Sequence, residues 1–299
     1  MEDDSARQYV SKGFGSQIGM TVYLDATIDN ICYLLNLDKR TAEVVENPDK
    51  YSGVVIIPES VVFQNETYIV REISDEAFMD CTELQAISIP SSVELIDKQA
   101  FSGCQVQLYI ENLEAWMNTK ISFEIYDEDG PLIDPEYNLP CVANALYVDG
   151  NPVKCLEIPN SIQVIKKWQF IGWDFITSFV ISESVSKIGY GAFQECSGIS
   201  EITIPASVTV IDAYAFYKCE GLKSVAIDGG VKDIGANAFG GLKNFCEFYC
   251  FVEVVPKTHE TAFDDSGIVQ YGTLYVPENA IENYRRTIPW CQFKSIVAV

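Results

Sequence analysis

Apolar residues along this chain alternate as in a strand and then spread to a wider spacing, and the whole pattern returns at a fixed interval. In the segment LQAISIPSSVELIDKQAFSGC (84–104), Ile87 and Ile89 alternate with smaller residues, which predicts a short strand with one buried face. Pro90 ends that strand because it has no N–H to contribute to a ladder. From Val93 onward the spacing lengthens, as expected of an arc or short helical turn that closes a coil.

A phenylalanine, usually preceded by alanine, marks one point of every repeat. The members of this series are Phe78, Phe101, Phe170, Phe193, Phe216, Phe239 and Phe263. Neighbours are 23 residues apart, with a final step of 24 and one gap of 69 residues, which is three periods. Such self-similarity predicts a solenoid of stacked coils, because one coil cannot bury its own apolar edge and stacked neighbours can.

Cysteines share this register. Four of them lie three residues after a repeat phenylalanine, at Cys81, Cys104, Cys196 and Cys219. Trp173 and Leu242 take the same place in other coils, which indicates an apolar slot that a free buried thiol can fill. A disulfide framework is the alternative interpretation. A zinc site is disfavoured, since the chain has one histidine and no C-x-x-C pair.

The order of these patterns predicts one continuous body with three parts. Residues 1–50 form a polar leader and an N-terminal hairpin cap, with the hairpin over Ile31 to Val45. Residues 51–270 form the solenoid, with irregular coils over 105–147. Residues 271–299 form a C-terminal cap. Its apolar closure is expected from Trp290, Phe293, Ile296 and Val297.

Several segments depart from the regular coil. Leu108 to Asn118 and Leu274 to Trp290 each combine a strand with a helical spacing, so we expect a short helix in place of the arc. Asp149-Gly150 suits a hairpin turn, and FQNETY (63–68) is expected to be a polar loop.

Charge and hydropathy narrow the classes of partner. The formal net charge of −23 and the pI near 4.3 argue against nucleic acid and against anionic membrane surfaces. No apolar run approaches the ~20 residues of a spanning helix. The N-terminal MEDDSARQYV has no apolar core of a signal peptide, so the protein is either cytosolic or its sequence starts after a removed leader.

Candidate catalytic chemistry is sparse, and no cofactor or metal is predicted. His259 is the one histidine, it is expected on the surface, and no serine sits in a G-x-S-x-G elbow. Asp127, Glu128, Asp129 and Asp134 lie in an acidic loop whose spacing does not match an EF-hand, and calcium binding there stays open. Asn65-Glu66-Thr67 is a glycosylation sequon, meaningful only in a eukaryotic secretory route. The chain is predicted not to be an enzyme.

The exposed side of the strands is the candidate binding site. The period places residues that alternate with buried strand positions in rows across a concave face. We expect this face to include Ser178, Val180, Glu201, Thr203, Ser224, Glu247 and Tyr249. Extended faces of this kind bind large partners in solenoid proteins.

The unit L-x-x-I-x-I-P-x-x-V-x-x-I-x-x-x-A-F-x-x-C resembles the BspA-like (Treponema-type) leucine-rich repeats of gut Bacteroides surface proteins. The flanks agree, with Cys32-Tyr33-Leu34, Tyr51-Ser52-Gly53 and a Leu-Tyr-Val-Pro/Pro-Trp tail, and the likeness covers 31–299. The resemblance implies a β-rich α/β fold, a right-handed leucine-rich-repeat solenoid, on a secreted or surface-anchored protein. It also implies adhesion to host matrix proteins or to other bacteria, and it supplies no catalytic residues.

Three functions follow as hypotheses. The first is a non-enzymatic extracellular or cell-surface binding protein whose strand face binds a protein or glycan partner, from host matrix or another bacterium. The second is a structural or assembly scaffold. The third, a hydrolase, would use carboxylates of the 127–134 loop.

Overall fold

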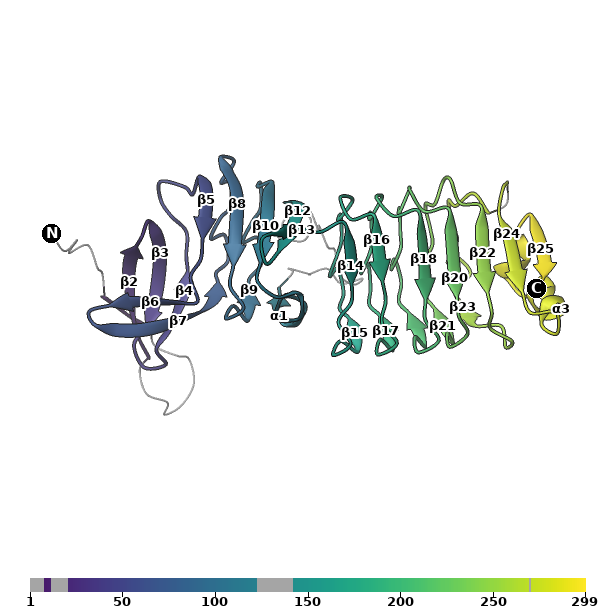
Figure 1. The fold of residues 1–299 in the computed structure, drawn as a ribbon, viewed down its shortest axis with the longest axis horizontal. Coiled ribbons are helices and arrows are strands. Elements are labelled where there is room, and N and C mark those ends of the chain that lie inside the picture. Colours follow the sequence, from purple (N-terminus) through teal and green to yellow (C-terminus); the bar gives the residue numbers. More distant parts are fainter. Residues whose placement is uncertain (1–7, 12–20, 123–141, 269) are drawn as a thin grey trace. The chain divides into compact units, whose positions relative to one another are not determined.

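The computed structural model describes residues 8–11, 21–122, 142–268 and 270–299, and most of its elements are β-strands (Figure 1). The chain divides into two compact units, Met1–Pro152 and Val153–Val299. In each unit, successive coils contribute parallel strands to shared sheets, so the predicted leucine-rich-repeat solenoid is confirmed.

The first unit holds two sheets. One has eight strands in the order β1-β2-β3-β4-β7-β9-β11, with β6 paired to β7, and the other has the order β13-β12-β10-β8-β5. The strands of the first sheet are β1 (Gln8–Ser11), β2 (Thr21–Ile28), β3 (Ile31–Asn36), β4 (Thr41–Val44), β6 (Ser60–Phe63), β7 (Glu66–Ile73), β9 (Leu95–Ile96) and β11 (Lys120–Ile121). Those of the second are β5 (Gly53–Ile56), β8 (Leu84–Ile89), β10 (Val106–Ile110), β12 (Ala143–Val148) and β13 (Asn151–Pro152). Helix α1 (Leu113–Asn118) follows β10.

The second unit is more regular. Its sheets have the orders β14-β16, β18-β20-β22-β24-β25 and β15-β17-β19-β21-β23, and all of their pairs are parallel. The longer strands are β14 (Cys155–Glu157), β16 (Ser178–Val180), β18 (Glu201–Ile204), β20 (Ser224–Ile227), β22 (Glu247–Cys250), β24 (Thr273–Val276) and β25 (Ser295–Ala298). The two-residue strands are β15 (Val164–Ile165), β17 (Lys187–Ile188), β19 (Val210–Ile211), β21 (Asp233–Ile234) and β23 (Lys257–Thr258). Helix α3 (Ile281–Arg286) and the short 3₁₀ helix η2 (Trp290–Gln292) lie between β24 and β25.

The repeat phenylalanines form the core of both units, as predicted. All seven are buried. Phe193 stacks on Phe216 with ring centroids 5.1 Å apart, and Phe216 stacks on Phe239 at 5.4 Å, both pairs with planes at 4°. Backbone bonds join the same coils, since the Phe216 N–H donates to the Ala238 carbonyl at 2.8 Å. Where successive coils both carry the phenylalanine, the repeat therefore places both a side-chain stack and a hydrogen bond at their interface.

The apolar slot three residues after each phenylalanine is confirmed by burial. Cys81, Cys104, Cys196 and Cys219 are buried free thiols, and Trp173 and Leu242 are buried in the same place. The Cys219 thiol donates to the Phe193 carbonyl at 2.9 Å, and the Cys196 thiol donates to the Phe170 carbonyl at 3.0 Å. The slot thus accepts a hydrophobe, and a cysteine there also satisfies a buried carbonyl of the preceding coil.

Both predicted helical variants of the coil are present. Asn112 caps α1, because its side-chain oxygen accepts the Ala115 N–H at 3.1 Å. Tyr284 of α3 is buried and donates to the Val252 carbonyl at 2.8 Å. After α3, Trp290 and Phe293 are buried as predicted, whereas Ile296 is half-buried and Val297 is exposed. The prediction for Val297 was wrong because β25 pairs with β24 and turns Val297 to the same side as Tyr275.

Three local predictions are corrected. Residues 8–11 of the expected polar leader form β1, which pairs antiparallel with β2; the other leader residues up to 20 lie outside the described residues. Where an arc or a short helical turn was expected, each of these coils has a two-residue strand, and these strands form a second sheet. The expected loop 63–68 is the turn of a β6–β7 hairpin, with Gln64 and Asn65 at positive φ.

The two units meet in sequence at Pro152 and Val153, and the boundaries predicted at residues 50 and 270 stay predictions. The predicted turn at Asp149-Gly150 is present and has a physical consequence. It folds β13 back so that Tyr147 and Val148 of β12 pair antiparallel with Pro152 and Asn151. Because β13 occupies this edge of β12, the parallel series of the first unit ends there.

Candidate binding surface

The strand side of the second unit carries two rows of outward side chains. Parallel register places Glu201 beside Ser224 and Ser224 beside Glu247. Two residues along the same strands, Thr203 lies beside Ala226 and Ala226 beside Tyr249. The residues between them, such as Val225 and Phe248, are fully buried. The rows therefore stand on a packed core that holds their spacing.

The structure brings five of the seven predicted residues together on β18, β20 and β22: Glu201, Thr203, Ser224, Glu247 and Tyr249. Ser178 and Val180 belong to β16, which pairs with β14 in a separate two-stranded sheet beside Cys155 and Glu157. Val180 is 49% exposed. The predicted rows are observed, whereas a binding role for them stays a prediction.

Two stacked tyrosines lie on β22 and β24, and only the first of them, Tyr249, was predicted from the sequence. Tyr249 and Tyr275 are neighbours on β22 and β24 and stack with centroids 4.4 Å apart and planes at 8°. The Tyr249 hydroxyl donates to the Glu247 Oε2 at 3.3 Å. Desolvation and then the Glu247 charge raise the pKa of Tyr249, which keeps its hydroxyl a donor. Tyr275 was missed because the step to its strand is 26 residues from Tyr249 rather than 23.

The first unit has a corresponding strand side with different chemistry. Ile56, Ser88, Tyr109 and Tyr147 form one row over β5, β8, β10 and β12. Tyr109 and Tyr147 stack with centroids 4.3 Å apart and planes at 4°. Neither this row nor the parallel row of Val54, Ala86, Gln107 and Ala145 contains a charged side chain, so the two units present different surfaces.

A groove on the other sheet of the second unit was not predicted. It has a volume of about 510 Å³ and is lined by three successive coils at β19, β21 and β23. Its lining includes the charged residues Asp212, Asp233, Lys257 and Glu260, together with His259. His259 is exposed, as predicted, and its Nδ1 lies 2.9 Å from the Thr261 hydroxyl. Sequence patterns gave no signal for this groove because its residues come from three repeats and share no motif.

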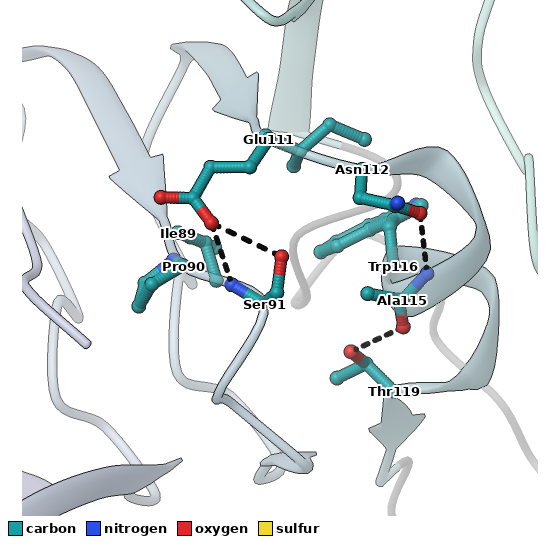
Figure 2. A pocket seen from close by; sticks show the side chains of 9 residues that line it. Ile89, Pro90, Ser91, Glu111, Asn112, Ala115, Trp116 and Thr119 are labelled. Carbon is teal, nitrogen blue, oxygen red and sulfur yellow. Dashed lines mark hydrogen bonds between the residues drawn. The ribbon is translucent and has the colours of Figure 1, made fainter.

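A small cavity in the first unit lies between β8, β10 and α1 (Figure 2). The Ser91 hydroxyl and N–H donate to the Glu111 Oε2 at 3.0 and 3.4 Å, which closes one side. The buried Trp116 Nε1 has no hydrogen-bond partner among the described residues. The volume of about 10 Å³ suits one water molecule rather than a ligand.

The remaining candidate features of the sequence are the acidic loop, a metal site and a membrane-spanning helix. The acidic residues Asp127, Glu128, Asp129 and Asp134 lie outside the described residues. Within the described ranges, no group of three or more His, Cys, Asp or Glu side chains is arranged to hold a metal ion. In the same ranges, no helix is both long enough and apolar enough to cross a membrane.

Comparison with protein families identifies the repeats. A model of the BspA type leucine rich repeat region matches in six copies over residues 59–120 and 144–269. The chain belongs to the BspA-type leucine-rich repeat family. The matched repeats of this BspA-type chain include all the coils that carry the phenylalanine stack. No curated protein matches the chain.

Solved structures are similar in fold. A leucine-rich repeat protein from Bacteroides ovatus is 17% identical, with 92% of this chain and 76% of that chain covered and a TM-score of 0.53. A leucine rich cell surface protein from Faecalibacterium prausnitzii is 16% identical, covering 92% and 94%, with a TM-score of 0.45. The pneumococcal vaccine antigen PcpA is 15% identical, covering 86% and 82%, with a TM-score of 0.40.

Proposed function

We propose that this BspA-type chain is a non-enzymatic binding protein, extracellular or on a cell surface, whose strand face in the second unit binds a protein or glycan partner. The observation that carries the proposal is the ordered pair of rows on β18, β20 and β22. Exposed Glu201, half-buried Glu247 and half-buried Tyr249 are held there at the regular spacing of a hydrogen-bonded sheet. Membership of a repeat family supports a binding role, because solenoids present extended faces to large partners.

Preorganisation supports the same conclusion. The row residues alternate with fully buried neighbours such as Ile202, Val225 and Phe248, so their backbone is ordered before any partner arrives. Binding to such a face loses little conformational entropy compared with binding to a loop. Glu247 and Tyr249 are already joined by a hydrogen bond in the unbound chain.

The test is surface-plasmon binding of the whole chain to a panel of extracellular-matrix proteins and mucin glycans, at low and physiological salt. We expect saturable binding to at least one member. The paired substitution Glu201→Lys and Glu247→Lys should weaken it by tenfold or more, because the charges of exposed Glu201 and half-buried Glu247 both reverse in the contact.

The matched control is Glu195→Lys with Glu260→Lys. Both glutamates are exposed, lie outside the two rows, and give the same change in net charge. Loss of binding in both paired variants would show a long-range charge effect rather than a contact with the strand face. Full binding in the strand-face variant would contradict the proposed surface.

A scaffold role is the second candidate, and one observation favours it. Val54 and Ile56 of β5 are 65% and 67% exposed, and β5 is the edge strand of its sheet. Exposed apolar edge strands pair readily with other chains. Light scattering of the chain and of Val54→Lys separates the two functions: a concentration-dependent oligomer abolished by Val54→Lys supports assembly through β5.

A further inference from the structure

The register of β18, β20 and β22 places the small side chains of the middle strand between larger ones, and this step of the two rows is called the notch below. β20 contributes the small side chains Ser224 and Ala226, whereas its neighbours contribute Glu201 on one side and Glu247 with Tyr249 on the other. Neighbouring strands lie about 4.8 Å apart, so the two glutamates are separated by roughly 10 Å across β20. That gap fits one side chain of a partner.

The wall of the notch on the β22 side is an aromatic ring. One face of Tyr249 is covered by Tyr275, with 4.4 Å between centroids. Phe251, two residues along the chain, lies next to the ring with centroids 6.3 Å apart and planes at 26°. On the β20 side the row neighbour is Ala226, whose methyl group is too short to cover a tyrosine ring. Half-exposed Tyr249 therefore offers the notch a ring face beside the Glu247 carboxylate.

Charge in the notch has one sign. The two rows of the second unit, followed through the described strands from β14 to β25, contain Glu157, Glu201 and Glu247 and no basic residue. Lys223 precedes β20 and lies outside the rows. A partner group that enters the notch is drawn in by these carboxylates if it is cationic and repelled if it is anionic.

We propose that this notch binds an arginine side chain presented by a basic segment of a protein partner. The guanidinium is planar and stacks on the Tyr249 ring, and its fork of N–H groups donates to the Glu247 or Glu201 carboxylate. A lysine ammonium meets the same charges but has no plane to stack, so arginine is preferred. The proposal rests on the proposed function and adds the chemistry of the partner to it.

The strand side of the first unit is the natural comparison. Tyr109 there stacks on Tyr147 and has Ser88 as its neighbour on the other side, which repeats the step from Ala226 to Tyr249. The row of Tyr109 contains no carboxylate. A small side chain beside a stacked tyrosine is therefore present in both units. Among the described rows, glutamates that could bind a guanidinium are present in the second unit alone.

The test is a TROSY titration of the whole, ¹⁵N-labelled chain with a Gly-Ser peptide that carries one arginine. The same peptide with lysine, and with citrulline as the neutral isostere, are the comparison probes. We expect shifts at the amides of β18, β20 and β22, and an affinity for arginine about fivefold above that for citrulline, as for one exposed ion pair. Ala226→Leu fills the notch and should abolish these shifts, whereas Ser88→Leu at the equivalent step of the first unit should leave them unchanged.

Equal affinity for the arginine and citrulline peptides, shifts elsewhere than at the notch, or unchanged binding by Ala226→Leu would each overturn the proposal. Tighter binding of a neutral oligosaccharide at the same amides would overturn it too. These results are separable from failure of the proposed function. Suppose that the partner found by surface-plasmon binding still binds the Glu201→Lys and Glu247→Lys variant more weakly than the parent chain. The strand face then binds a macromolecule, and only the proposal of an arginine side chain is contradicted.

Discussion

Phe193 and Phe216, separated by 23 residues in sequence, stack ring on ring with centroids 5.1 Å apart and planes at 4°. This contact is one step of a series, since Phe216 stacks on Phe239 in the same manner and Phe239 on Phe263 at 5.8 Å. Stability in such a molecule is a sum of interfaces between neighbouring coils.

Removal of one ring should therefore weaken two interfaces at once. We expect Phe216→Ala to lower the free energy of unfolding by ~3–5 kcal/mol, because the ring is fully buried and leaves a cavity between coils. Phe251→Ala is the matched control, since its ring is 44% exposed, and it should cost less than about 1 kcal/mol. Urea unfolding followed by circular dichroism measures both variants, and equal stability of the two would contradict the stack as the core.

Exposed cysteines should be alkylated faster than the buried cysteines of the coils. Burial raises the pKa of Cys104 and Cys250 to about 11 and raises the pKa of Cys219 as well, so little thiolate forms at pH 8. Cys155, Cys246 and Cys291 are exposed. Alkylation of the native chain with iodoacetamide, read by mass spectrometry of peptides, should label the exposed set first. All of these cysteines should react after denaturation, and rapid native labelling of Cys219 would contradict its place in the slot.

The first unit should lose stability as pH rises through neutrality. Burial, then the neighbouring Glu43 and Asp97, raises the pKa of Glu72 to about 7. A raised pKa in the folded state means that the protonated form stabilises the fold. Its contribution is complete below the unfolded pKa of about 4.3 and is lost as pH rises through about 7.

Because Glu72 is partly exposed, we expect a change on the order of 1 kcal/mol between pH 5.5 and 8.5, after allowance for solvent screening. Hydrogen–deuterium exchange of peptides from β4 and β7 measures it within the first unit. Glu72→Gln should remove the dependence and slow exchange at pH 8.5, whereas Glu83→Gln, on an exposed residue away from Glu43, should leave it in place. The comparison uses protection factors, because the intrinsic rate of amide exchange itself rises with pH. Equal protection factors at both pH values in the parent chain would contradict the assignment.

The sequence was informative wherever the period was strict. Phe216, Cys219 and Val225 could be placed in the core from spacing alone, because each coil must repeat the same contacts to stack. The same reasoning placed Glu201, Ser224 and Glu247 in one row, and the strand register confirms that placement. The two-residue strands were missed even in the regular coils, because two residues are too few to show an alternation. The β6–β7 hairpin was missed because its polar turn at Gln64 and Asn65 was interpreted as part of a loop.

By itself the sequence determined the repeat, the buried positions and the outward rows, since these follow from local alternation and a constant interval between coils. The tertiary structure alone decided three further features. It divided the chain at Pro152, because β13 pairs with the edge that the next coil would use. It placed Tyr275 against Tyr249 across an irregular 26-residue step, and it assembled the groove at β19, β21 and β23 from three repeats. Such features depend on which strand edges pair and on side chains meeting across coils, and neither is a property of any one segment.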